Sequence, residues 1–213
     1  MPTALFSLSA VCTLNLLLFL CCFTHSFYLI DLLNYCSYRW HNNYSKDITN
    51  NNLALYQKYT RKDICRLLNW ESNEESVIYG YKRDTKTNTC PIFVTYQKVK
   101  LAGATTDYKD RFVDNYQFRW QSKDGKVLSK DETLQDIQNS DTNGLLIPLF
   151  VMKSDNEGGN FYYVGNCTVA EISQSKHETK KGVRPIVNVI FNMDPPIKDE
   201  ILNYLEQDFS EEI

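Results

Sequence analysis

A basic helix that runs directly into a pair of aromatic segments constrains this chain more than any other part of its sequence. Thr60, followed three residues later by Asp63, forms the pattern of a capping box and predicts the start of a helix. Apolar residues then recur at helical spacing from Ile64 to Leu68, so that one side of the helix is expected to be buried. We expect the helix to end near Asn69.

The segments Val77–Lys82 and Pro91–Gln97 are rich in β-branched and aromatic residues, and the turn-prone run from Lys86 to Asn88 lies between them. This arrangement predicts a β-hairpin. A helix that carries Lys and Arg beside a sheet that carries aromatic rings can hold a phosphate backbone and stack a base. The combination therefore favours nucleic-acid binding over ordinary enzyme chemistry.

The remainder of the body alternates short apolar runs with turn signals. Further strands are expected at Asn115–Ser122, Leu145–Met152, Phe161–Val169 and Pro185–Asn192, and helices at Ser129–Asn139 and Ile197–Phe209. Six short strands with helices at both ends predict an α+β fold built on a curved mixed or antiparallel sheet, or on a small β-barrel with flanking helices.

The first forty residues form an apolar N-terminal segment in which Asp31 is the first charged side chain and Arg39 the first basic one. Residues 4–23 have about the length of a membrane-spanning helix. A membrane anchor, a signal segment and a translation artefact all remain open for this region. We expect residues 41–52 to form an Asn-rich linker, residues 53–209 the main domain, and residues 210–213 an acidic tail.

Charge sets a second limit on function. Residues 41–213 carry 22 basic and 25 acidic side chains, so this part of the chain is slightly acidic. A protein that grips a duplex only by neutralising phosphates is usually strongly basic. Any nucleic-acid binding by this chain must therefore rely on a local patch and a pocket.

Catalytic and metal-binding patterns are missing from the sequence. There is no Gly-rich phosphate loop, no HExxH pattern, and no Cys or His spacing typical of zinc, so no cofactor and no metal are expected. Cys65 and Cys90 lie in apolar patterns without a neighbouring His, which favours core packing over nucleophilic chemistry. The chain is accordingly expected not to be an enzyme.

The candidate site residues come from the aromatic strands and the basic helix. Alternation along a strand sends Phe118, Trp120 and Ser122 to one face, where a Trp beside a small hydroxyl could form one wall of a base pocket. Tyr79 or Tyr81 could supply the opposite wall. The expected phosphate contacts are made by the cations Lys58, Arg61, Lys62 and Arg66.

Several of these segments carry a family resemblance. The blocks concerned are Tyr59–Trp70, Ile78–Lys82, Cys90–Tyr96, Phe118–Trp120, Leu149–Asp155 and Phe161–Gly165. Together they resemble the C-terminal domain of unknown function of bacterial Type IV, modification-dependent restriction nuclease–helicase proteins. The resemblance covers roughly Leu53 to Leu205 and implies a domain similar to the SET-and-RING-associated and PUA-like barrels, which flip a modified cytosine into a pocket. The nuclease and helicase parts of such proteins have no counterpart in this sequence.

Three functional hypotheses follow. The first is a non-catalytic DNA reader that flips a modified base, methylated cytosine foremost, into an aromatic pocket as the specificity part of a restriction or helicase system. Its partners would be duplex DNA and a separately encoded helicase or nuclease. The second is a membrane-tethered protein-interaction domain without nucleic-acid binding, associated with the membrane through residues 4–30. The third is an orphan hydrolase. In the first two, the body is expected to be cytoplasmic.

Overall fold

A computed structural model describes residues 27–44, 53–97, 110–179 and 182–207, and the chain divides into two compact units, residues 1–46 and 47–213. The first unit contains α2 (Phe27–Tyr44), an 18-residue helix. It exposes Leu32, Leu33 and Tyr35, each by more than half of its surface. The start of the expected linker is helical instead, because α2 continues to Tyr44.

The apolar run at residues 4–23 lies outside the described residues. Within the described ranges, no helix is both long and apolar enough to cross a membrane.

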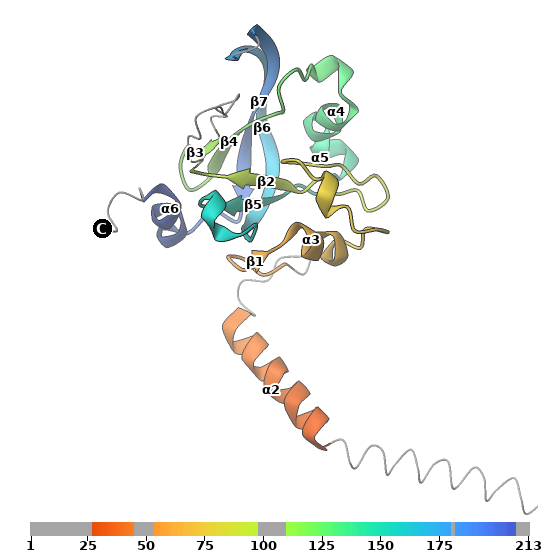
Figure 1. The fold of residues 1–213 in the computed structure, drawn as a ribbon, viewed down its shortest axis with the longest axis vertical. Helices are drawn as coiled ribbons and strands as arrows, with labels where there is room; N and C mark the ends of the chain where they lie inside the picture. Colours follow the sequence, from red (N-terminus) through yellow and green to blue (C-terminus); the bar gives the residue numbers. More distant parts are fainter. Residues whose placement is uncertain (1–26, 45–52, 98–109, 180–181, 208–213) are drawn as a thin grey trace, which may run out of the picture. The chain divides into compact units, whose positions relative to one another are not determined.

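The second unit holds a sheet with short helices at its margins (Figure 1). Its strands are β1 (Lys58–Tyr59), β2 (Ile92–Thr95), β3 (Arg111–Phe112), β4 (Gln117–Gln121), β5 (Pro148–Met152), β6 (Phe161–Thr179) and β7 (Gly182–Asp194). Its α-helices are α3 (Arg61–Leu67), α4 (Glu132–Gln138), α5 (Ser140–Asn143) and α6 (Asp199–Glu206). Three 3-10 turns complete the described part at Glu75–Val77, Leu128–Lys130 and Asp155–Glu157.

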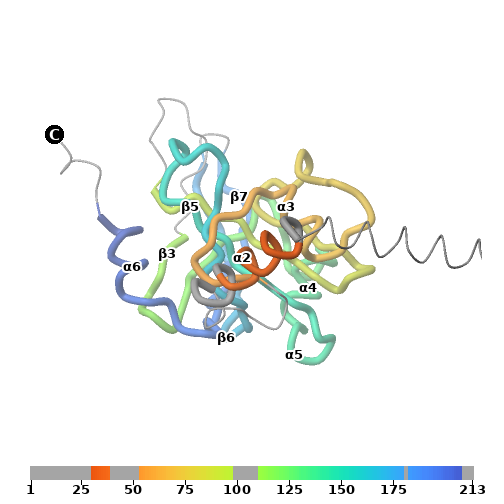
Figure 2. The backbone as a smooth tube through the Cα atoms, turned by 90° about the horizontal axis from the view of Figure 1, so that it is seen from below, coloured from red at the N-terminus to blue at the C-terminus, as the bar shows by residue number. Residues whose placement is uncertain are grey.

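The described strands form one mixed sheet in the order β2-β5-β6-β7-β4-β3, with β1 paired to β6. β2 and β5 run parallel, and every other pair of strands in it is antiparallel. The sheet curls into a half-barrel, with α4 and α5 on one side of it and α6 on the other (Figures 1 and 2). The expected α+β class with a curved mixed sheet is confirmed.

The expected hairpin between Val77–Lys82 and Pro91–Gln97 is present in an irregular form. Antiparallel bridges in one register join Asp84 to Thr89 and Tyr81 to Ile92, but Glu75–Val77 is a 3-10 turn and no continuous ladder forms. Gly80 has a φ of +79°, which takes the backbone out of the extended conformation next to Tyr81. β2 pairs over all four of its residues with β5, a long-range partner that local patterns cannot identify.

β4 shows the strict alternation expected of a strand with one buried face. Phe118 and Trp120 are buried, whereas Gln117, Arg119 and Gln121 are half-buried on the opposite face. The inward residues join a core that also contains Val187, Val189 and Phe191 of β7. β4 therefore separates an apolar interior from a polar outer face.

β6 and β7 form a long hairpin whose register shifts once. Val169 pairs with Phe191, but the next paired residue, Glu171, lies opposite Ile190, so Ala170 is an extra residue in the ladder. Up to the bulge the odd-numbered Cys167 and Val169 pack against the core, and beyond it the even-numbered Ile172 does so. Glu171 and the odd-numbered residues that follow it consequently share the outer face with Arg119 and Gln121.

Candidate nucleic-acid interface

One hollow on the sheet domain lies between the segment after α3 and the strands β2 and β4. Its volume is about 540 Å³, within the range of small-molecule pockets. The residues that line it are Arg61, Glu75, Ser76, Ile78, Tyr79, Gly80, Tyr81, Phe93, Val94, Thr95, Asp110, Trp120, Gln121 and Lys123. We call it the aromatic hollow, since Tyr79, Tyr81, Phe93 and Trp120 all contribute to it.

The capping box at the start of α3 places Arg61 in this hollow. The Asp63 amide donates to the Thr60 hydroxyl at 3.1 Å, and the Thr60 amide donates to the Asp63 carboxylate at 3.0 Å. Hydrogen bonds from Thr60 hold the pKa of Asp63 below its usual value. The expected helix start is thus confirmed, and it fixes Arg61 as the first residue of the helix.

The Arg61 guanidinium lies over two aromatic rings, 4.7 Å from the centroid of Phe161 and 5.3 Å from that of Phe93. It forms no ion pair with the described carboxylates, and its buried Nε has no hydrogen-bond partner there. Burial lowers the pKa of Arg61. A guanidinium that is taken out of water without a counter-charge attracts an anion or a carbonyl oxygen into the hollow.

One wall of the hollow is an edge-to-face pair of rings. Tyr81 and Trp120 have centroids 4.9 Å apart and planes at 83°. Both are almost fully buried, with exposed fractions of 6% and 2%. The Lys123 ammonium lies 4.7 Å above the Tyr81 ring, and burial followed by repulsion from Lys126 lowers its pKa. Tyr79 is different, because 71% of its surface is exposed and its ring is accessible to a ligand.

Two of the residues expected in the base pocket are not among those that line it. Phe118 has no exposed surface and packs in the core against Phe112, with ring centroids 4.8 Å apart. The Ser122 hydroxyl is buried and accepts a hydrogen bond from the Val187 amide at 3.0 Å. Strand alternation correctly put both residues on the face of Trp120, but that face is the core.

Of the four cations expected to contact phosphates, only one is among the residues that line the hollow. Arg61 lines the hollow, whereas Lys58, Lys62 and Arg66 do not. Lys58 forms an ion pair with Glu157 at 3.3 Å and lies over the Tyr162 ring. Lys62 and Arg66 are exposed on α3. Successive residues of a helix are about 100° apart around its axis, so Arg61 and Lys62 of α3 cannot face the same site.

Lys123, Gln121 and Phe93 also line the hollow and were not expected to from the sequence. Phe93 comes from β2, which the sequence assigned to a hairpin, and Lys123 is the second residue after β4. A signal for Lys123 existed, since a cation two residues beyond a Trp-bearing strand can fold back over the neighbouring ring. Its partner ring, Tyr81, could not be identified from the sequence.

Neither thiol considered as a nucleophile has the environment of one. Burial raises the pKa of Cys90 to about 12 and also raises the pKa of Cys65, so neither thiolate is populated near neutral pH. In the part of the chain that the structure covers, no group of three His, Cys, Asp or Glu side chains is placed to hold a metal ion.

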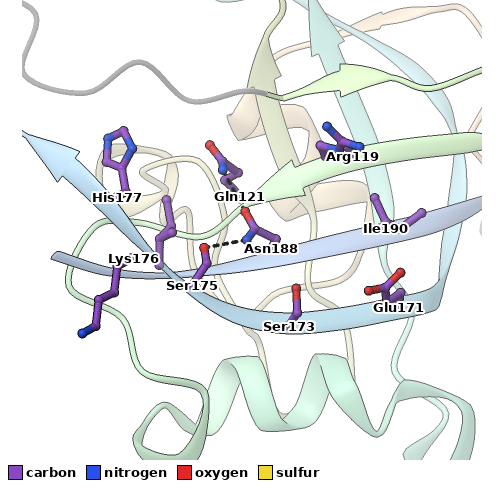
Figure 3. A pocket seen from close by; sticks show the side chains of 10 residues that line it. Arg119, Gln121, Glu171, Ser173, Ser175, Lys176, His177, Asn188 and Ile190 are labelled. Carbon is purple, nitrogen blue, oxygen red and sulfur yellow. Dashed lines mark hydrogen bonds between the residues drawn. The ribbon is translucent and has the colours of Figure 1, made fainter. Parts of the chain in front are cut away.

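The second hollow, of about 420 Å³, lies on the outer face of β4, β7 and β6 (Figure 3). We call this region the polar face. The hollow is lined by Arg119, Gln121, Glu171, Ser173, Ser175, Lys176, His177, Ile186, Asn188 and Ile190. Gln121 donates to Asn188 at 2.8 Å, and Asn188 donates to Ser175 at 2.7 Å. Gln121 lines both hollows, which are therefore neighbours.

A family model described as "Domain of unknown function (DUF3427)" matches residues 53–205. This match confirms the resemblance inferred from the sequence. No curated protein matches this chain.

The structural neighbours are SRA domains and modification-dependent restriction endonucleases. The SUVH5 SRA domain with hemi-methylated CG DNA is 11% identical and covers 71% of this chain and 94% of its own (TM-score 0.45). The DNA modification-dependent restriction endonuclease AspBHI is 14% identical, covering 70% and 79% (TM-score 0.45). The sulfur-binding and SRA domains of ScoMcrA, complexed with phosphorothioated DNA, are 13% identical, covering 75% and 47% (TM-score 0.41).

Proposed function

We propose that this chain, which belongs to the DUF3427 family, is a non-catalytic reader of a modified base in duplex DNA. In this proposal the target nucleotide leaves the base stack and enters the aromatic hollow. The observation that carries the proposal is the combination of the exposed Tyr79 ring and the uncompensated Arg61 guanidinium in one hollow of about 540 Å³. A methylated cytosine is the first candidate for the modified base.

The two features have separate roles. Tyr79 is the one ring of the hollow with most of its surface exposed, so it can stack on an extruded base. Arg61 offers a charged donor to the base edge or to the phosphate of the same nucleotide. Trp120 and Tyr81, which pack edge to face, form an apolar wall of the hollow.

Energetics are compatible with flipping. Extruding a base costs a few kcal/mol, and stacking on an aromatic ring returns about 1–3 kcal/mol per base. A hydrogen bond to a charged group adds about 1.5–3 kcal/mol. One stack on Tyr79 and one contact with Arg61 therefore roughly offset the cost of extrusion. A net preference then depends on how the modification fits the hollow.

The test is equilibrium binding of the full chain to duplexes that differ only at one nucleotide. The probes are an unmodified duplex, one with a single methylcytosine, and one with a single phosphorothioate, the modifications named for the neighbouring structures. We expect tighter binding to a modified duplex. Tyr79→Ala should reduce that affinity by about 5- to 150-fold, the equivalent of losing one stacked base.

Tyr116→Ala is the matched control, because Tyr116 is also an exposed tyrosine, at 64%, and does not line the aromatic hollow. It should bind every duplex as the wild type does. A fluorescent base analogue next to the modified position should brighten when the complex forms, because unstacking relieves quenching. Equal, weak binding to all three duplexes would rule the proposal out.

Cleavage and translocation would belong to a separate chain in this proposal. The sequence contains no Gly-rich phosphate loop, so it lacks the usual means of using a nucleoside triphosphate. We expect the reader to act with a separately encoded helicase or nuclease, which co-purification of the tagged chain with such a partner would test.

A second candidate function is a membrane-tethered protein-interaction domain. The exposed apolar side chains of α2 favour it, among them Leu32, Leu33 and Tyr38. Fractionation of cells that express the tagged full chain separates the two functions. Recovery in the membrane fraction, together with no affinity for any duplex, would select the second candidate.

A further inference from the structure

Two arginines face each other across the edge of the polar face without any carboxylate between them. Arg111 of β3 and Arg119 of β4 are directly paired in the antiparallel ladder, so their side chains leave the same face of the sheet. No ion pair or hydrogen bond joins either side chain to another described residue. Like charges in this position repel, and an anion bound between them would relieve the repulsion.

The polar face continues from this pair along β7 and β6. Ile190 lies opposite both Arg119 and Glu171, Asn188 lies opposite Gln121 and Ser173, and Arg184 lies opposite His177. Ile190 is six residue steps along β7 from Arg184, which corresponds to about 20 Å at ~3.3 Å per step. Consecutive phosphates of one strand advance by about 3.4 Å along a duplex axis, so this length matches several of them.

The side chains of the polar face are of the types that contact phosphates and sugars. Arg, Ser, Asn and Gln are among the side chains that donate hydrogen bonds to phosphates and sugars in protein–DNA complexes. Figure 3 shows the side chains of Gln121, Ser173 and Asn188 rising from the same face of the sheet, whereas the Lys176 amino group points away from them. The Ser173 hydroxyl has no hydrogen-bond partner in the described part of the chain. The amide ladder from Gln121 to Asn188 keeps the neighbouring amide groups in fixed orientations.

The shared residue Gln121 connects this face to the aromatic hollow. A nucleotide that occupied the aromatic hollow would have its flanking backbone close to Gln121, and hence close to Arg119 two residues earlier on the same side of β4. The polar face would then hold a backbone segment and the aromatic hollow a base.

From this arrangement we infer that the polar face, from the Arg111–Arg119 pair to Asn188 and Ser173, binds the sugar–phosphate backbone of the DNA strand read at the aromatic hollow. The inference rests on the proposed function for the identity of that strand. It assigns to the polar face a contribution to affinity that is the same for modified and unmodified DNA. Glu171, the carboxylate that lines the second hollow, weakens this contribution.

The experiment is a salt titration of binding with the double variant Arg111→Ala/Arg119→Ala. We expect affinity to fall about 10-fold or more, by the same factor for modified and unmodified duplexes. The slope of log affinity against log salt should become shallower by about 2, since each lost phosphate contact removes ~0.9. Glu171→Gln should raise affinity for both duplexes alike, and neither variant should alter the preference for the modified base.

The matched control is Lys130→Ala/Lys198→Ala, which removes two exposed cations that line neither hollow. An equal loss of affinity in the control would overturn the inference, because the effect would then reflect net charge alone. Thermal unfolding of the double variant should occur no lower than in the wild type, since the substitution removes a repulsive pair.

Competition distinguishes a backbone site from a site for free anions. An abasic single-stranded oligonucleotide should displace duplex from the wild type and lose this ability with the double variant. Inorganic phosphate, at matched ionic strength, should have no effect on either. Displacement by inorganic phosphate from the wild type alone would show a small-anion site and overturn the inference.

The inference and the proposed function fail in different ways. If the wild type shows no preference among the duplexes but the double variant binds all of them more weakly, the polar face binds DNA and the reader function is wrong. If the preference is present and the double variant binds as the wild type does, the reader function stands and the polar face has no role.

Discussion

Residues from opposite faces of β4 line the aromatic hollow and the polar face. The aromatic hollow includes a residue of the hydrophobic core, whereas the β4 residues of the polar face lie outside the core. Trp120 lines the aromatic hollow and is also part of the hydrophobic core, with 2% of its surface exposed. Arg119 and Gln121, its sequence neighbours, lie half-buried on the other side of β4. A substitution in the wall of the aromatic hollow therefore changes folding together with recognition, whereas a substitution on the polar face can change binding alone.

Trp120→Ala tests the sharpest form of this contrast and should have the largest effect. Removing a buried indole ring should destabilise the domain by about 3–5 kcal/mol. Arg119→Ala, one residue away, should change the free energy of unfolding by no more than about 0.5 kcal/mol. Urea unfolding of both variants measures the difference. Equal destabilisation would mean that the polar face also contributes to the fold.

Arg61→Ala should separate binding from folding inside the aromatic hollow. The side chain has no ion pair with any described carboxylate, so its loss should lower the free energy of unfolding only through its contacts with the Phe93 and Phe161 rings, by about 0.5–2 kcal/mol. If Arg61 contacts the extruded nucleotide, affinity for the modified duplex should fall by an amount equivalent to about 1.5–3 kcal/mol. Arg66→Ala, on the same helix but away from the hollow, should bind as the wild type does.

Ser122→Ala examines a residue that the sequence placed in the base pocket. Its hydroxyl accepts a hydrogen bond from the Val187 amide, and its removal would leave a buried donor unpaired. We expect a loss of about 1–3 kcal/mol in stability. The ratio of affinities for modified and unmodified duplexes, measured well below the unfolding temperature, should not change. A changed ratio would mean that Ser122 contacts the ligand after all.

Acid pH should lower the free energy of unfolding of the domain by a small amount, through Asp63 at the start of α3. The pKa of Asp63 is lowered in the folded state, so the stability it contributes is present above its unfolded pKa of about 3.9 and is lost as the pH falls through the lower folded value. We expect Asp63→Ala to cost about 0.3–1 kcal/mol near pH 6. In denaturant titrations this difference should shrink below about pH 4. A difference that stayed constant as the pH was lowered further below about 4 would contradict the assignment.

The sequence predicted those parts of the fold that depend on local patterns. The capping box at Thr60, the alternation in β4 and the amphipathic C-terminal helix all appear in the structure. The hairpin at Val77–Lys82 is reduced to two bridges, and the continuous partner of β2 is β5, more than fifty residues later in the chain. Local propensity carries no information about such a pairing.

The candidate site was predictable to a similar extent. Tyr79, Tyr81, Trp120 and Arg61 were expected, and all four line the aromatic hollow. Phe118 and Ser122 were expected on the same face as Trp120, but the pattern could not show that this face of the sheet is covered by the hydrophobic core. The polar face was not anticipated, because the strand expected at Phe161–Val169 extends to Thr179 across the bulge at Ala170.

That bulge has a consequence for comparing relatives of this protein. Because Ala170 is an extra residue in the ladder, the inward-facing positions of β6 are odd-numbered before it and even-numbered after it. Ala170 is exposed, and its identity should be free to vary. A relative that lacks this residue would keep the counterpart of Ile172 inward and that of Ser173 outward, because each retains its partner on β7. An alignment that ignores a one-residue gap at this point would match inward positions with outward ones and assign the wrong residues to the DNA-facing surface.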